Sequence, residues 1–372
     1  MKNKILSLFL AAIVFSLITS SCSRHTPVTP MPAATPITYT YFDADNSNIA
    51  YYGRWDFTDP KNPAADWGPV YIKVNFQGPG ISVKFNDPNN NFQYSIDNGN
   101  FKTVAGNAAL EYDLAEGLAD TTHQLLFVRR SECDFGTTIF QGVGLAQGMQ
   151  LLPVSQPPSH RIEFIGDSIS CGYGDEDTAG AGNTRSDENG YMAFGPQTAR
   201  LFGADWHVIA ESGIGVVKND GETVIGTELH IQDLYVRTVS SETISWNFSS
   251  WVPDAVVVEA GANDFIDGAP FPTQAQFEAA YGSLLDFIRS KYPNAYIFCL
   301  SYYPDNNCPQ YISDAVSARS ADTKIIFVDA VSTPWLLPLP GNYISDGVHP
   351  TVAGQTIVAG ELHNFMENYL HW

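Results

Sequence analysis

The sequence predicts two folded domains of different class: an all-β sandwich or jelly roll, followed by an α/β domain built on a parallel sheet. Residues 37–150 hold short strand patterns separated by turns, whereas residues 161–372 alternate strands with helices. A proline-rich stretch, 151–160, lies between the two patterns. A chain of 372 residues is also longer than one average domain and long enough for two.

The start of the chain predicts an export signal. Lys2 and Lys4 precede an apolar segment, 5–18, which is short for a transmembrane helix and ends in small residues before Cys22. This pattern resembles a bacterial lipoprotein signal. We therefore expect residues 1–22 to be a signal with Cys22 acylated, and residues 23–36, rich in Pro, Thr and Ser, to form a tether. The expected location is the cell envelope, at the outer membrane or cell surface, and ordinary secretion is the alternative.

The first domain has the period of half-buried strands. Alternation is clearest at 71–76, a Gln-Gly-Pro-Gly turn follows, and Asp97-Asn98-Gly99-Asn100 has hairpin character. Frequent turns between short strands favour a sandwich or jelly roll, which could bind carbohydrate or serve as a structural companion. The predicted strands are 71–76, 81–85, 92–96, 124–128 and 139–145.

The second domain starts at Arg161, after Pro153, Pro157 and Pro158 have interrupted regular structure. Thr273 is a plausible N-cap for the following helix, and Pro293 ends it. Five strands with covering helices imply a three-layer, flavodoxin-like parallel sheet. The predicted strands are 161–166, 205–211, 255–260, 295–302 and 324–329, and the predicted helices are 190–202, 273–291, 310–319 and 351–370.

The composition excludes some classes of partner. A formal charge of −21 argues against nucleic acid or an anionic membrane surface as a partner, because both would be repelled. Aromatic residues make up 13% of the chain, which suits either sugar stacking or an aromatic-rich β core.

The cysteines beyond Cys22 show no paired spacing of the kind that binds zinc. Cys299 and Cys308 are the nearest pair for a disulfide, and buried free thiols are the equal alternative. The four cysteines concerned are Cys133, Cys171, Cys299 and Cys308.

Ser168 is the candidate nucleophile. It follows Gly166 and Asp167 at the end of the first strand of the α/β domain, where open parallel sheets bind ligands. A serine there can attack a carbonyl if a base reaches it and N–H donors face the resulting oxyanion. Taken alone, Gly-Asp-Ser also fits a serine that caps a helix.

His349 is the candidate base, with Asp346 three residues earlier to hold its tautomer. Asp120 and His123 share this spacing, but they lie in the β domain and suggest a satisfied surface or strand-edge pair. The other histidines considered, which lack such a partner in sequence and are expected to be structural, are His207, His230, His363 and His371.

The candidate oxyanion donors also follow strands. Asn263 lies in Gly-x-Asn-Asp after the buried strand 255–260, and Gly213 or Gly215 follows the strand 205–211. Asn219 is a rival asparagine, although it follows no strand that ends in glycine.

Together these motifs resemble the SGNH, or GDSL-type, hydrolase superfamily. The resemblance covers Arg161 to the C-terminus, and the two-domain layout resembles carbohydrate esterase family 2, which pairs a jelly roll with an SGNH domain. Further stretches supporting the resemblance are Gly53-Arg54-Trp55, Phe127-Val128-Arg129-Arg130, Gly172-Tyr173-Gly174, 246–251 and Gly261-Ala262-Asn263-Asp264-Phe265.

The resemblance implies a role for each matching residue. Ser168 would be the nucleophile, His349 the base and Asp346 the third member, with Gly213 and Asn263 joining the Ser168 amide in the oxyanion hole. Val348 stands where members of the family often carry an aromatic residue. We therefore expect another aromatic, such as Trp251 or Trp335, to provide the sugar-stacking surface.

The function that the resemblance implies is removal of O-acetyl groups from plant polysaccharides or oligosaccharides such as acetylated xylan or mannan. The reaction needs no metal or organic cofactor, and we expect a monomer. Two alternatives remain open. One is an esterase or thioesterase acting on lipids or on acetylated sialic acid, and the other is a glycan-binding surface lipoprotein without catalysis.

Overall fold

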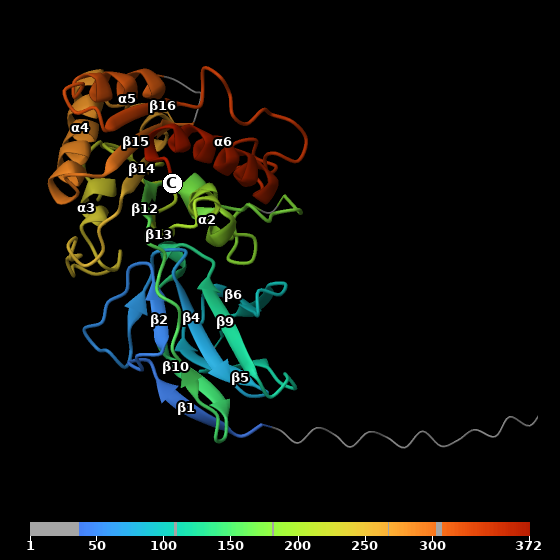
Figure 1. Cartoon of the computed structure of the whole chain (residues 1–372). Coiled ribbons are helices and arrows are strands. Elements are labelled where there is room, and N and C mark those ends of the chain that lie inside the picture. The colour runs from blue at the N-terminus through green and yellow to red at the C-terminus, as the bar shows by residue number, and fades with distance from the viewer. Residues whose placement is uncertain (1–36, 108–109, 181, 267, 303–306) are drawn as a thin grey trace, which may run out of the picture. The chain divides into compact units, whose positions relative to one another are not determined.

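The computed structural model describes residues 37–372 except 108–109, 181, 267 and 303–306 (Figure 1). Within this part of the chain, Ile37–Trp372 form one compact unit. The expected signal, Cys22 and the tether lie outside the described residues. Among the residues that are described, no helix is long and apolar enough to cross a membrane.

The first domain consists of two antiparallel sheets. One has the order β1-β10-β5-β8, with β3 beside β10, and the other has the order β11-β4-β9-β6-β7, with β2 beside β4. The strands are β1 (Tyr39–Asp43), β2 (Ile49–Tyr52), β3 (Ala64–Ala65), β4 (Tyr71–Gln77), β5 (Ile81–Asn86), β6 (Asn91–Ile96), β7 (Lys102–Ala105), β8 (Glu111–Ala115), β9 (Thr122–Arg129), β10 (Thr138–Ala146) and β11 (Leu151–Leu152).

Aromatic side chains fill the space between these two sheets. Phe85 stacks on Tyr112 with ring centroids 4.2 Å apart, and Phe92 stacks on Phe127 at 5.2 Å. All four rings are buried. Packing of this core therefore accounts for part of the aromatic content of the chain.

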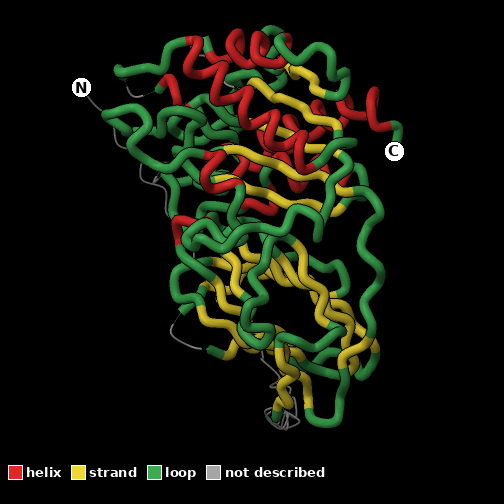
Figure 2. Tube along the Cα trace, turned by 90° about the vertical axis from the view of Figure 1, so that its left-hand side faces the viewer, coloured by secondary structure: helices red, strands yellow, loops and turns green. Residues whose placement is uncertain are grey.

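The second domain has the predicted parallel sheet, with the flavodoxin-like order β13-β12-β14-β15-β16. Figure 2 shows the helices gathered around this sheet. The strands are β12 (Arg161–Gly166), β13 (Asp205–Ala210), β14 (Ala255–Glu259), β15 (Tyr296–Ser301) and β16 (Ile325–Asp329). The helices are α1 (Ser168–Cys171), α2 (Phe194–Leu201), α3 (Ile231–Tyr235), α4 (Gln274–Lys291), α5 (Cys308–Ser317) and α6 (Val352–Leu370), with short 3₁₀ turns η1 (Cys133–Phe135), η2 (Gly190–Met192) and η3 (Asn263–Phe265).

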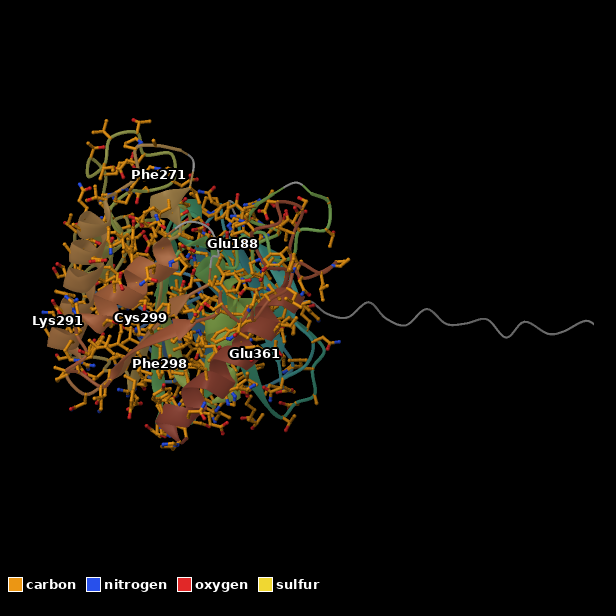
Figure 3. The ribbon with its side chains drawn as sticks, turned by 90° about the horizontal axis from the view of Figure 1, so that it is seen from above. Glu188, Phe271, Lys291, Phe298, Cys299 and Glu361 are labelled. Carbon is orange, nitrogen blue, oxygen red and sulfur yellow. The ribbon has the colours of Figure 1, made fainter. Side chains whose placement is uncertain are left out.

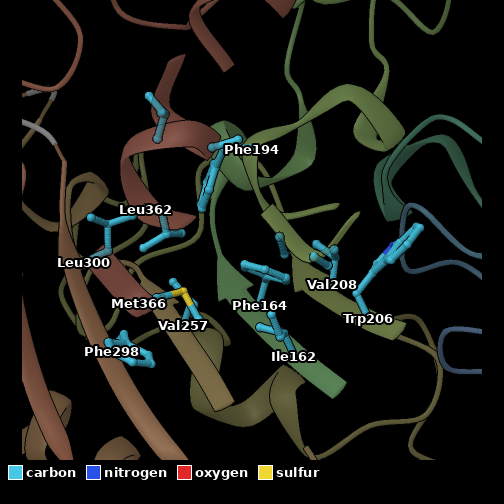
Figure 4. Close-up of a cluster of buried hydrophobic side chains, with 14 of the residues drawn as sticks. Ile162, Phe164, Phe194, Trp206, Val208, Val257, Phe298, Leu300, Leu362 and Met366 are labelled. Atoms are coloured by element: carbon cyan, nitrogen blue, oxygen red, sulfur yellow. The ribbon is translucent and has the colours of Figure 1, made fainter. Parts of the chain in front are cut away.

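Each face of the parallel sheet has its own core. Successive strand residues point to opposite faces, so Phe164 packs under α2 and α6 while Ile165 packs under α3, α4 and α5. Figure 4 shows the first cluster, with Phe194 and Met366 over the sheet. In Figure 3, Lys291 of α4 and Glu361 of α6 lie on either side of β15, as a three-layer arrangement requires.

The structure differs from the sequence-based expectation at several element ends. The predicted linker begins too early, because Leu151 and Leu152 form β11 against β4. The predicted helix 190–202 is split into η2 and α2, since Ala193 is extended. The four described cysteines are buried and none is in a disulfide, so the predicted alternative of a bridge between Cys299 and Cys308 was wrong. Thr273 forms the expected N-cap, with a capping box to Gln276.

Candidate active site

The chain turns sharply at the end of β12 and presents Ser168 as the first residue of α1. Gly166 permits this turn, because a Cβ there would lie 2.0 Å from the Ser170 Oγ. Asp167 caps α1 by accepting a hydrogen bond from the Ile169 N–H at 3.2 Å. Ser168 remains 9% exposed, so its hydroxyl reaches the surface of a cavity.

His349 meets this serine from the loop before α6. Its Nε2 lies 2.8 Å from the Ser168 Oγ, and its Nδ1 lies 2.7 Å from the Asp346 Oδ2. The Tyr173 ring stacks on the imidazole with centroids 4.2 Å apart. The structure thus brings the predicted serine, histidine and aspartate into one hydrogen-bonded chain.

Asp346 stays ionised in this chain. Burial raises the pKa of its carboxyl, but hydrogen bonds from the Val348 N–H and from the His349 ring and backbone outweigh burial, and the pKa is lowered overall. A carboxylate at this place stabilises the Nδ1–H tautomer, which leaves the His349 Nε2 lone pair directed at Ser168.

The cavity beside Ser168 has a volume of about 430 Å³. Gly213 lines it with a φ of +78°, in the left-handed region that favours glycine. Among the described residues, none accepts a hydrogen bond from the Gly213 N–H. The lining consists of Asp167, Ser168, Ile169, Tyr173, Ser212, Gly213, Asp220, Ala262, Asn263, Ile266, Asp346, Val348 and His349.

Asn263 borders the same cavity from η3. Its Nδ2 donates to the Ile214 carbonyl at 2.8 Å and more weakly to the Asp167 Oδ2 at 3.3 Å. The rival positions are engaged elsewhere. The Gly215 N–H donates to the Asn219 Oδ1 at 2.9 Å, and the Asn219 side chain donates to the Leu229 carbonyl. Gly213 and Asn263 both line the cavity beside Ser168, whereas Gly215 and Asn219 do not.

Three buried carboxyl groups lie at the cavity: Asp167 lines it, whereas Glu259 and Asp264 do not, and the sequence analysis assigned none of them a role. Burial raises the pKa of Asp167 to about 7 and that of Asp264 to about 6. Glu259, at the end of β14, is hydrogen-bonded to Asp167, and burial and the charge of Asp167 raise its pKa well above its usual value. A neutral Glu259 beside Asp167 avoids burying two negative charges together. The sequence signal that could have identified Asp264 is its place as the last residue of the Gly-x-Asn-Asp motif, directly after Asn263.

The other histidines in the described part of the chain do not line the cavity. His123 pairs with Asp97 at 2.7 Å and not with Asp120, because Asp97 lies at the hairpin end of the adjacent β6. His230 has a partner that the sequence did not reveal, since its Nε2 lies 2.9 Å from the Glu222 Oε2. His207, His363 and His371, which were expected to be structural, do not line the cavity either.

Neither Trp251 nor Trp335, the tryptophans named as possible sugar-stacking residues, lines the cavity beside Ser168. Trp251 is buried against His207, at 3.7 Å between ring centroids, and donates to Asp205. Asp205 begins β13 and pairs with the first residue of β12, so Trp251 lies at the end of the sheet opposite Ser168. Trp335 packs against Phe365 of α6. The aromatic residue that does line the cavity is Tyr173.

Among the described residues, one cluster brings together three side chains of the kinds that can bind a metal ion. Cys133, Asp134 and Glu211 offer atoms within 4.8 Å of one another. None of the three lines the cavity at Ser168. The chemistry available in that cavity is therefore that of a hydroxyl, an imidazole, a carboxylate and N–H donors.

Comparisons with known proteins agree with this geometry. Residues 51–155 match the family described as carbohydrate esterase 2 N-terminal, and residues 164–357 match the GDSL-like lipase/acylhydrolase family. The chain is similar to the cellulase/esterase CelE of Acetivibrio thermocellus, with 34% identity over 346 residues, 89% of this chain and 40% of that protein. It thus spans well under half the length of CelE.

Two further relatives support the match. A Cellvibrio japonicus protein named acetylxylan esterase / glucomannan deacetylase is 27% identical over 274 residues, 71% of this chain and 68% of that protein. A solved structure of a family two carbohydrate esterase from Clostridium thermocellum, in complex with cellohexaose, superposes with a TM-score of 0.77 at 32% identity, covering 87% of this chain and 99% of that one. The chain therefore belongs to the GDSL-like lipase/acylhydrolase family, in the two-domain form of carbohydrate esterase family 2.

Proposed function

We propose that this protein is a serine esterase that removes O-acetyl groups from plant polysaccharides or oligosaccharides. The observation that carries the proposal is the hydrogen-bonded chain from Ser168 to His349 and Asp346, at 2.8 and 2.7 Å, beside a cavity lined by Gly213 and Asn263. A nucleophile, an oriented base and N–H donors around one small cavity are the set that acyl transfer requires.

Each group has a step in the reaction. His349 takes the Ser168 hydroxyl proton through Nε2 as the oxygen attacks the acetyl carbonyl, and Asp346 stabilises the imidazolium. The N–H groups of Ser168, Gly213 and Asn263 stabilise the oxyanion, and one such donor is worth about 3 kcal/mol. His349 then protonates the departing sugar oxygen. Water, activated by the same imidazole, releases acetate from the acetyl-enzyme.

The lining of the cavity is consistent with a substrate that carries a short acyl group. Apolar side chains of Ile169, Ile266 and Val348 line its 430 Å³ beside the serine. Relatives named as carbohydrate esterase and as acetylxylan esterase / glucomannan deacetylase support an acetylated polysaccharide as substrate. We also propose export, with the chain anchored through an acylated Cys22, on the basis of the apolar segment and the cysteine that follows it.

Ser168→Ala tests the proposal. The variant should fold like the wild type and lose about 10⁴-fold or more in kcat, because the nucleophile is gone. Activity is measured as hydrolysis of p-nitrophenyl acetate and as acetate release from acetylated xylan and glucomannan. Ser250→Ala, at an exposed serine, is the control.

Three results would contradict the proposal. Esterase activity retained by Ser168→Ala would exclude this serine. A preference for p-nitrophenyl octanoate over the acetate would favour a lipid esterase, and binding of acetylated glycans without acetate release would favour a glycan-binding protein.

A further inference from the structure

The segment Ser212–Lys218 carries the Gly213 donor, and the α/β domain fixes its far end. Asp264 accepts hydrogen bonds from three consecutive N–H groups, those of Val216, Val217 and Lys218, at 2.7 to 3.0 Å. The near end, at Ser212, is held by a different domain.

Glu132 of the β domain holds that near end. It follows β9 and precedes η1, and it is 2% exposed. Its Oε1 accepts a hydrogen bond from the Ser212 Oγ at 2.6 Å, and its Oε2 accepts one from the Ser212 N–H at 2.6 Å. Oε2 also accepts from the Cys171 Sγ, at 3.3 Å, at the end of the short helix that begins with Ser168.

Glu132 is itself held in place. Its N–H donates to Glu188, which is fully buried and also accepts from the Asn183 side chain at 2.7 Å. Burial and the charge of Glu132 raise the pKa of Glu188 well above its usual value, and a hydrogen bond joins the two carboxyl groups. Figure 3 marks Glu188. Glu132 therefore has a partner in Glu188, in addition to the hydrogen bonds that its side chain accepts from Ser212 and Cys171.

The peptide unit between Ser212 and Gly213 carries the N–H that faces the cavity, so the position of Ser212 sets the direction of that N–H. Two hydrogen bonds to one buried carboxylate fix both the backbone and the side chain of Ser212. We infer that Glu132 is a positioning residue for the oxyanion hole, by which the β domain holds Ser212 and so aims the Gly213 N–H at the carbonyl bound by Ser168. This inference rests on the proposed esterase function.

A second β-domain carboxylate makes a comparable contact away from the cavity. Asp66 is fully buried and accepts hydrogen bonds from the N–H and Oγ of Ser240 at 2.8 and 2.9 Å. It also accepts from Ser241. None of these residues lines the cavity. Asp66 is therefore a matched control: like Glu132 it joins the β domain to the α/β domain, but its contacts lie away from the oxyanion donors.

The test is Glu132→Gln in the full chain, compared with Asp66→Asn. In each variant an amide NH₂ replaces an oxygen that faces donors, so each loses a comparable contact. For Glu132→Gln we expect kcat for p-nitrophenyl acetate to fall about ten- to a hundredfold, with KM within about twofold, because only transition-state stabilisation is lost. Affinity for methylboronic acid, which forms a tetrahedral serine adduct, should weaken by a similar factor. Asp66→Asn should lower the unfolding temperature but keep kcat within about twofold of wild type.

The outcomes separate this inference from the proposed function. Should Ser168→Ala remain active, the proposed function fails. If that variant is inactive while Glu132→Gln keeps wild-type kcat and boronate affinity, the positioning role alone is wrong. An equal loss of kcat in Asp66→Asn would also overturn the positioning role of Glu132. It would mean that losing any contact between the two domains lowers kcat. If Glu132→Gln does not fold, Ser212→Ala decides: a kcat reduced roughly tenfold at unchanged KM supports the role, and an unchanged kcat refutes it.

Discussion

The Asp346 carboxylate serves both the turn that carries His349 and the imidazole ring. Its Oδ1 accepts the N–H groups of Val348 and His349 at 2.8 and 3.0 Å, and its Oδ2 accepts the ring Nδ1–H at 2.7 Å. Asp329 forms the same kind of turn, accepting from the Val331 and Ser332 N–H groups at 3.0 and 2.8 Å, with no histidine attached. Asp346 therefore has an imidazole partner that Asp329 lacks.

Asp346→Asn should therefore reduce activity through the tautomer of His349. An asparagine can still accept backbone hydrogen bonds, but its NH₂ would face the ring nitrogen and favour the tautomer that cannot accept the Ser168 proton. We expect kcat to fall about 10²- to 10⁴-fold, measured on p-nitrophenyl acetate. Asp329→Asn, the control, should leave kcat unchanged. A near-wild-type Asp346→Asn would mean that Ser168 and His349 work as a dyad.

The secondary-structure elements that were predicted best are those whose start and end are both marked by nearby residues. The α4 helix begins after Thr273, whose side chain accepts from the Gln276 N–H while the Gln276 side chain accepts from the Thr273 N–H. The strands that sequence reasoning missed carry weaker patterns. β7 presents mostly exposed residues, β8 alternates exposed and buried residues over only five positions, and β3 and β11 have two residues each. Strands of that kind exist because a neighbouring strand pairs with them, and periodicity alone does not reveal the neighbour.

Thr273→Ala tests the capping signal. Loss of the cap should lower the free energy of unfolding by about 1 kcal/mol, measured by urea denaturation, with esterase kcat unchanged. Ser283→Ala is the control within α4, because its exposed hydroxyl only donates back to the Ala279 carbonyl at 2.7 Å. Equal destabilisation by both changes would show that the cap contributes nothing specific.

For the molecule as a whole, a buried ion pair links the β domain to the parallel sheet. Arg54 donates to Glu163 of β12 at 3.0 Å, and both side chains are fully buried. Arg54 also donates to the carbonyls of Tyr235 and Arg237 at 2.6 and 2.8 Å, and the Tyr235 hydroxyl donates to Glu163 at 2.6 Å. Since Ile37–Trp372 form one compact unit, we expect both domains to unfold together.

Glu163→Gln should destabilise this unit by about 3 to 5 kcal/mol, because it leaves the Arg54 charge buried without a counter-charge. Differential scanning calorimetry should show a single transition at a lower temperature. Asp286→Asn removes a partner of Arg319 that is 65% exposed, and it should cost less than about 1 kcal/mol. Two separated transitions in the wild type, or equal effects of the two changes, would contradict the role of the buried pair.

The sequence by itself determined the fold class, the parallel strand order and the grouping of Ser168, His349 and Asp346. Strand periodicity, the turn at Gly166 and the short spacing from Asp346 to His349 are local, and parallel strands bring their ends to one edge. Tertiary structure alone decided that the Gly215 N–H is bound to Asn219, that Trp251 lies at the opposite end of the sheet, and that Glu132 reaches Ser212 from the other domain. Those contacts join residues far apart in the chain, and only packing of the two domains brings them within hydrogen-bond distance.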